Sequence, residues 1–309
     1  MIQSEKHGII DIRRRKMKPK VYYSKEISPE SLLGIYKALG VELTGKVAVK
    51  VSSGEKGAKG YLKADLIAPL VKEINGTIVE CNTAYPGARN NAKEHLEVAK
   101  EHGFDFAPID IMDSDSDIKL PVKNGKHLEY DLVGSHIQEY DSMLNLAHGK
   151  GHAMGGFGAN LKNQSIGVAS RKGKAYIHSC GKTESPRLCW MTKFEQIDFI
   201  ESMAEAAKAV ADYFKEQNKP ILYITVMNAI SEDCDCDAHQ GDPVMKDLGI
   251  IGSLDPVAND QAFLDLIWNS EDPGKDKIIE RITSREGEKI TKYAEKLGLG
   301  STDYELVML

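Results

Sequence analysis

Two histidines and two lysines lie together in one glycine-rich stretch of the chain. His148, Lys150, His152 and Lys162 fall between residues 148 and 162, where five glycines separate them. Glycine lets a ligand approach the backbone, imidazole can serve as acid, base or metal ligand, and an amine can serve as cation or nucleophile. The alternative interpretation is that the glycines only allow tight packing of a strand on a helix. The combination of residue types favours a functional site.

A second group of chemically active side chains follows an apolar strand expected at residues 221–227. Cys234, Cys236 and His239 lie within six residues, and two thiols with an imidazole suit a soft or borderline metal. Because Cys-x-Cys has no second pair beside it, distant residues would have to complete four ligands. The candidates are His148, His152, His178, Cys180 and Cys189. A polar active-site loop whose cysteines bind no metal explains the pattern equally well.

The order of elements predicts an α/β fold with mostly parallel sheets flanked by helices. Strands are expected at 21–24, 46–51, 77–81, 106–112, 143–147, 221–227, 250–253 and 304–308. Helices are expected at 28–39, 62–74, 90–101, 195–216 and 257–268, and a further helix is expected to start at Phe157. We predict two lobes with a cleft between them: a basic arm at 1–20, an N-terminal lobe at 21–142 with a hairpin insertion, and a C-terminal lobe at 143–309 that carries both motifs. The site is expected at the carboxyl ends of the strands.

Composition limits the partners. The formal charge of −6 and the lack of a basic aromatic face argue against a nucleic acid or a membrane surface as the main partner. No leader of signal-peptide form and no span of about 20 apolar residues is recognisable, so we expect a cytoplasmic protein with a small-molecule ligand. Five cysteines do not form a disulfide framework in a chain of this length. Homo-oligomerisation is left open.

Several motifs resemble the domain-of-unknown-function family 362. They lie at residues 148–163, 167–174, 177–179, 234–237 and 243–262, and the resemblance covers nearly the whole chain from about residue 20. It implies an iron–sulfur protein, because many members carry a ferredoxin-type module after the histidine–serine pair. This chain has no such run between Cys180 and Cys189, so an inserted ferredoxin-type cluster is not expected.

A more distant resemblance is to the nickel-pincer lactate racemase family. His152, Lys162 and His178 fall at the places of that family's acid–base histidine, cofactor-attaching lysine and nickel-ligand histidine, whereas the loop 83–87 lacks a second acid–base histidine. The missing histidine argues against a two-base racemase, so the resemblance implies the location of the site and not the reaction. Our function hypothesis is a redox or racemase-like enzyme acting on a small organic acid, and the alternative is a non-catalytic metal or small-ligand carrier. We predict a transition metal or iron–sulfur cluster of open identity as cofactor. The predicted residues are His152 and Lys162 for catalysis, Lys150, Gly156, Gly158, Lys162 and Asn163 for cofactor binding, and His148, His178, Cys234, Cys236 and His239 for metal binding.

Overall fold

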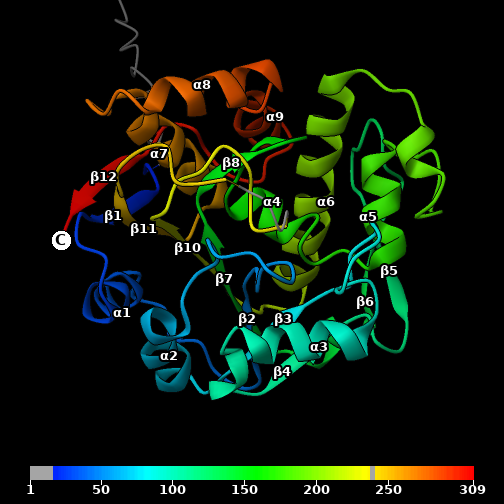
Figure 1. The fold of residues 1–309 in the computed structure, drawn as a ribbon, viewed down its shortest axis with the longest axis horizontal. Coiled ribbons are helices and arrows are strands. Elements are labelled where there is room, and N and C mark those ends of the chain that lie inside the picture. Colours follow the sequence, from blue (N-terminus) through cyan, green and yellow to red (C-terminus); the bar gives the residue numbers. More distant parts are fainter. Residues whose placement is uncertain (1–16, 237–240) are drawn as a thin grey trace, which may run out of the picture.

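One large α/β sheet organises the molecule, for which a computed structural model describes residues 17–236 and 241–309 (Figure 1). The strands are β1 (Lys20–Ser24), β2 (Val47–Lys50), β3 (Gly76–Glu80), β4 (Ile109–Ile111), β5 (Asp117–Pro121), β6 (Tyr130–Gly134), β7 (Ser142–His148), β8 (Lys150–His152), β9 (Gly156–Gly158), β10 (Ile221–Met227), β11 (Gly249–Ser253) and β12 (Glu305–Met308). The helices are α1 (Pro29–Ala38), α2 (Ala64–Glu73), α3 (Ala92–Glu101), α4 (Asn160–Gln164), α5 (Arg171–His178), α6 (Gln196–Glu216), α7 (Pro256–Trp268), α8 (Lys275–Ser284) and α9 (Lys289–Lys296). Short 3₁₀ turns span Phe104–Phe106, Ser135–Glu139 and Cys189–Met191.

The main sheet has eight strands in the order β12-β1-β11-β10-β7-β2-β3-β4. Strands β10, β7, β2, β3 and β4 pair in parallel, as do β1 and β12, and β11 runs antiparallel to both of its neighbours. The mostly parallel α/β fold is thereby confirmed. Because β7 pairs with β2, the sheet continues across the boundary predicted at residues 142 and 143. The division into two lobes therefore stays a prediction.

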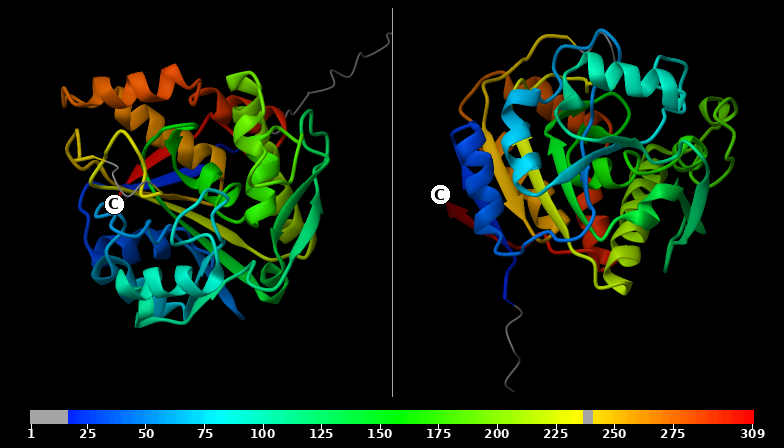
Figure 2. Two further views of the ribbon diagram at one scale, coloured as in Figure 1. Left: turned by 45° about the vertical axis from the view of Figure 1, so that its right-hand side comes forward. Right: turned by 90° about the horizontal axis from the view of Figure 1, so that it is seen from below.

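The two faces of the sheet are covered by different helices (Figures 1 and 2). Successive side chains of a strand point to opposite faces, so Val47 and Val49 pack with α1 and α2, whereas Ala48 packs with α6. Both faces are buried, which is why these strands read as continuous apolar runs. In the right-hand view of Figure 2, α1 and α2 (blue and light blue) lie in front of the strands.

Strands β5 and β6 form an antiparallel hairpin where one was predicted, and it packs beside α5 and α6 (Figure 2). That the hairpin is an insertion in an N-terminal lobe stays a prediction. Two predicted boundaries differ from the structure. The strand expected at 106–112 is only β4, because residues 104–106 form a 3₁₀ turn that buries Phe104. The helix expected from Phe157 begins at Asn160, because Gly156 adopts a φ of +78° and residues 156–158 pair with β8. Within the described residues, no helix is long and apolar enough to cross a bilayer.

Candidate functional site

A cavity lies at the carboxyl ends of β2, β3, β7 and β10, where the sequence places its polar residues. Its volume is about 850 Å³, counting the open mouth. The chain runs outward from β2 to β3 and β4, then returns to the other side of β2 as β7. The carboxyl ends of β2 and β7 therefore form a switch point, the place where open α/β sheets bind ligands. The cavity thus lies at the edge where the sequence analysis expects the site, and its function stays a prediction.

The cavity lining carries more cationic than acidic side chains. The cations are Lys50, Arg89, Lys162 and Lys174, and the carboxylates are Glu80 and Asp235. The Lys174 amine donates to the backbone carbonyls of Cys81 and Ala169 at 3.3 and 2.5 Å, and burial lowers its pKa. This balance favours an anionic ligand over a cationic one.

Lys50 and Glu80, at the ends of β2 and β3, form a buried ion pair of 3.0 Å. The Arg89 guanidinium lies 3.6 Å from Glu80, and the backbone N–H of Ser53 donates to the same carboxylate at 2.6 Å. Burial alone would raise the pKa of Glu80, but Lys50, His95 and Arg89 together lower it to about 2. The Glu80 carboxylate is thus charged at neutral pH, and it holds the side chains of Lys50 and Arg89 in place.

Helix α4 presents Lys162 to the cavity, and a buried polar network fixes this helix. The Asp260 carboxylate of α7 accepts the N–H groups of Asn160 and Leu161, both at 2.9 Å, and so caps the helix from outside. The Asn163 amide donates to Asn145 of β7 at 2.7 Å and to the carbonyl of Lys50 at 3.0 Å. These bonds tie α4 to β2, β7 and α7 at once, so the position of Lys162 is well determined.

Lys162 is half-buried at the cavity wall, and its amine has no carboxylate partner among the described residues. Its hydrogen-bond acceptor there is the Cys234 sulfur, 3.7 Å from Nζ. Burial lowers the pKa of Lys162 to about 7, and nearby Lys50, Arg89 and Lys150 act in the same direction against Asp235. The amine is therefore close to half-protonated at neutral pH, which suits a group that must both take and return a proton.

The ring of His152 is oriented by the backbone that follows it. Its Nδ1 accepts the N–H of Gly155 at 2.8 Å and that of Met154 at 3.2 Å. Burial, with Lys162 and His178 adding to it, lowers the pKa of His152 well below its usual range. Since Nδ1 is an acceptor in a neutral ring, the proton lies on Nε2. His152 is thus a neutral hydrogen-bond donor in the cavity wall.

His178, the last residue of α5, has the opposite tautomer. Its Nδ1 lies 2.6 Å from the carbonyl oxygen of Lys174 and must donate to it, which leaves a lone pair on Nε2. Burial lowers the pKa of His178 to about 4. The ring lies against Trp190 and Phe199, with centroids 5.1 and 5.2 Å away. His178 is therefore a neutral acceptor in the same cavity.

Asp235, between the two cysteines, anchors their loop. Its carboxylate forms an ion pair with Lys150 and lies 3.2 Å from Nδ1 of His148. The other nitrogen of His148, Nε2, lies 2.7 Å from the carbonyl oxygen of Asn228. Both ring nitrogens of His148 and the Lys150 amine are therefore engaged, which gives these two residues a role in positioning the loop.

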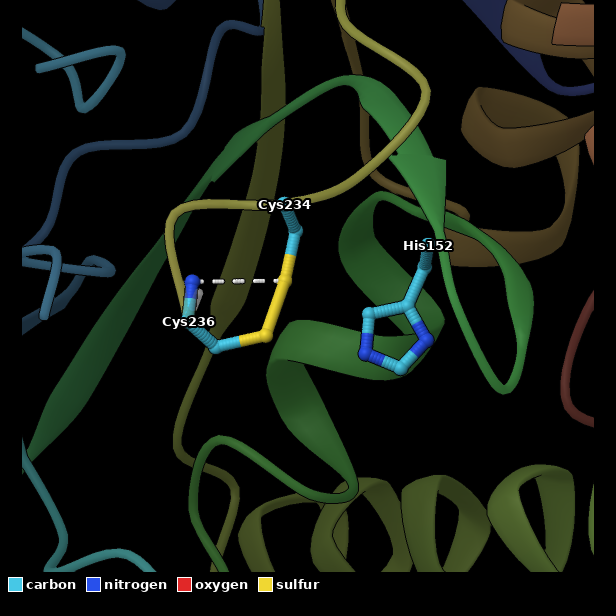
Figure 3. Close-up of side chains that lie close together, drawn as sticks. All are labelled: His152, Cys234 and Cys236. Atoms are coloured by element: carbon cyan, nitrogen blue, oxygen red, sulfur yellow. Dashed lines mark hydrogen bonds between the residues drawn. A yellow bond between two sulfur atoms is a disulfide. The ribbon is translucent and has the colours of Figure 1, made fainter. Parts of the chain in front are cut away.

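Cys234 and Cys236 are joined by a disulfide whose sulfur atoms face the ring of His152 (Figure 3). Their sulfur atoms and a ring nitrogen of His152 lie within 4.8 Å of one another, a spacing that could hold a metal ion. In this state the group does not fit a metal, because the sulfurs are bonded to each other and His152 carries its proton on Nε2. The other three cysteines do not join the group, so four thiols for an iron–sulfur cluster are not assembled.

Several predicted residues lie outside this cavity. Gly156 packs against residues 282 and 287, where a Cβ would come within 2.9 Å of the Ile282 carbonyl. Cys180 and Cys189 are buried free thiols away from the lining. His239 and residues 1–16 of the basic arm lie outside the described residues. The cavity does bring together His148, His152, Gly158, Lys162, Asn163, His178, Cys234 and Cys236.

Sequence reasoning missed Lys50, Glu80, Arg89, Lys174 and Asp235. A signal existed for Lys50 and Glu80, because a charged residue closes each of the apolar runs Val47–Lys50 and Gly76–Glu80. Asp235 could have been noticed as the acid between two thiols. Nothing local distinguishes Arg89 or Lys174 from a solvated surface residue.

A family model described as domain of unknown function (DUF362) matches residues 47–265. The chain belongs to this family. The search against curated proteins gave no significant match.

Among solved structures, the lactate racemase apoprotein from Thermoanaerobacterium thermosaccharolyticum is similar at 14% identity and a TM-score of 0.44, over 82% of this chain and 57% of that one. A structural-genomics protein from Thermotoga maritima is similar at 11% identity and a TM-score of 0.41, over 85% and 60%. This DUF362 chain spans less than two thirds of the length of either protein. The site is therefore interpreted from its own residues.

Proposed function

We propose that the cavity is the active site of an isomerase-like enzyme that binds a small organic acid and moves a proton at the carbon next to the carboxylate. One observation carries the proposal: the Lys162 amine, with a pKa of about 7, shares a cavity with the neutral N–H donor of His152. A base is most effective when its pKa lies near the working pH. A neutral imidazole can stabilise an oxyanion by hydrogen bonding.

The cationic lining supports an anionic substrate. Lys174 is buried, with Asp113 and Glu80 close enough to favour its charged form, but among the described residues its hydrogen bonds go only to backbone carbonyls, so a substrate carboxylate would give it a direct ion pair. The Nε2 lone pair of His178 can accept a hydroxyl or amino proton of the substrate. A carboxylic acid with a hydroxyl or amino group on its second carbon would therefore have partners for both groups, Lys174 and His178.

In this scheme Lys162 takes the proton from the second carbon of the substrate, the electron pair spreads onto the carboxylate oxygens, and the proton returns to the same carbon. Negative charge develops on the substrate oxygen, and the Nε2–H of His152 donates a hydrogen bond to it. Lys174 holds the carboxylate, and His178 orients the second substituent. Metal binding by thiols of the reduced loop, as predicted from the sequence, is not required by these steps.

The test is exchange of the substrate proton in D₂O, followed by proton NMR over a panel of short-chain 2-hydroxy, 2-amino and 2-methyl acids. We expect exchange with at least one class, rising with pH through about 7 as Lys162 becomes the free amine. Lys162→Gln and His152→Ala should each slow it by roughly 10²- to 10⁴-fold while calorimetry still detects binding. His136→Ala, whose ring pairs with Asp110 at the surface, is the matched control and should exchange normally.

Absence of both exchange and binding across the panel would contradict the proposal. A wild-type rate that is flat between pH 6 and 9 would remove Lys162 as the base. Circular dichroism of each variant separates loss of the fold from loss of the reaction.

A further inference from the structure

The Cys-x-Cys loop carries a disulfide whose position is hard to explain by stability. The two cysteines are separated by a single residue, Asp235, so the bond closes a very short loop. A disulfide restricts the unfolded chain in proportion to the logarithm of loop length, and a loop of this size restricts it least. The reason for this bond therefore lies in its chemistry.

The surroundings of the two sulfurs differ. Cys234 Sγ is approached by the Lys162 amine at 3.7 Å and by the backbone N–H of Cys236 at 3.4 Å. Its residue is buried, with 8% of its surface exposed, whereas Cys236 is more exposed at the cavity wall. Two hydrogen-bond donors thus point at Cys234 Sγ. The sulfur that an incoming group can reach is that of Cys236.

Contacts that do not involve the sulfur atoms hold the loop in place whether the Cys234–Cys236 bond is formed or broken. Asp235 stays tied to Lys150 and His148, and its backbone carbonyl accepts the N–H of Glu55 at 2.8 Å. The phenol of Tyr85 donates to the carbonyl of Cys236 at 3.0 Å. Both cysteines would therefore remain side by side after reduction, which favours re-formation of the bond.

We propose that Cys234 and Cys236 form a redox-active site that undergoes thiol–disulfide exchange with a small-molecule thiol or dithiol entering the cavity. The incoming thiolate attacks Cys236 Sγ and forms a mixed disulfide, while the Cys234–Cys236 bond breaks and its electron pair leaves on Cys234 Sγ. Lys162 and the Cys236 N–H stabilise that thiolate. A second thiol of the reductant displaces Cys236, so the small molecule is oxidised by two electrons and the protein holds two thiols.

This inference does not rest on the proposed isomerase function. A protein that exchanges substrate protons but holds no disulfide would contradict only the redox proposal. A protein that cycles thiols but exchanges no proton would contradict only the isomerase.

The experiment begins by lysing cells in a thiol-blocking reagent and counting blocked cysteines by mass spectrometry of the full-length protein. We expect that in an appreciable fraction of the protein Cys234 and Cys236 are not blocked. Apart from the blocking groups, this fraction should be two mass units lighter than the dithiol form. The purified disulfide is then reduced by dithiothreitol at pH 7, and the rate is compared with that of an unstructured peptide of residues 231–239.

Lys162→Met should slow reduction by about tenfold, because a leaving thiolate that loses a nearby amine donor is less stable and leaves more slowly. Lys37→Met, on the exposed face of α1, should leave the rate unchanged. After glutathione disulfide treatment, Cys234→Ser should accept glutathione at Cys236 faster than Cys236→Ser accepts it at Cys234.

Three results would overturn the proposal. The first is full blocking of both thiols in every fraction of the isolated protein. The second is a tightly bound metal on those thiols, measured by elemental analysis, which makes the loop a metal site. The third is a reduction rate equal to that of the peptide and insensitive to Lys162→Met.

Discussion

The residues that matter most are buried groups whose protonation is fixed by their neighbours. His152 accepts two backbone N–H groups at Nδ1, and His178 donates to a backbone carbonyl from Nδ1. The two rings are the same side chain with opposite chemistry, which no sequence pattern reveals. Their low pKa values follow from burial, so neither ring should be charged at neutral pH.

We expect ¹⁵N NMR of the histidine rings to find His152 as the Nε2–H tautomer and His178 as the Nδ1–H tautomer at pH 7. His178 should gain its second proton only near pH 4, because burial disfavours the charged ring. The variants His152→Ala and His178→Ala assign the signals. A proton on Nδ1 of His152, or two protons on either ring at pH 7, would contradict this assignment.

At the scale of the element, α4 is the piece whose position decides the site. It has five residues and no capping side chain of its own, so the Asp260 carboxylate from α7 supplies the cap. A helix this short is not stable alone and depends on tertiary contacts. The sequence predicted a helix start near this point but could not predict a cap supplied about 100 residues later.

Asp260→Ala should therefore lower the free energy of unfolding by about 1–3 kcal/mol, because the N–H groups of Asn160 and Leu161 lose their acceptor inside the protein. Proton exchange should fall as well, since Lys162 is carried by the same helix. Denaturant titration measures the first effect. Asp276→Ala, in the exposed first turn of α8, should change the unfolding free energy by no more than about 0.5 kcal/mol. Equal stabilities of the two variants would show that the cap is unimportant.

At the scale of the whole molecule, most helices and strands could be predicted from the sequence. The pairing of distant strands in one sheet could not. Apolar runs identified β2 and β10, which are buried on both faces, and helical spacing of apolar residues identified α1 and α6. The pairing of β2 with β7 joins residues about 95 apart in the chain, and such long-range register leaves no local trace. That one eight-stranded sheet spans both predicted lobes is therefore known only from the structure.

The same limit applies to the cavity. Its motif residues were predicted because histidine, lysine and cysteine are chemically distinctive. The ion pair of Lys50 with Glu80 was missed, because its members lie at the ends of two different strands and meet only through the sheet. The disulfide was missed because pairing depends on how the loop is held by Lys150 and Tyr85. Homo-oligomerisation and a cytoplasmic location stay predictions.

The central claim is that Lys162 is held close to neutrality inside the cavity. Its most direct test is a pH titration of the Lys162 side chain by ¹³C NMR at Cε, with Lys162→Met identifying the signal. The structure predicts a midpoint of about 7, because burial without a carboxylate partner disfavours the ammonium form. A midpoint near the ordinary lysine value of about 10.4 would contradict the account, since Lys162 would then be a fixed cation and not a base.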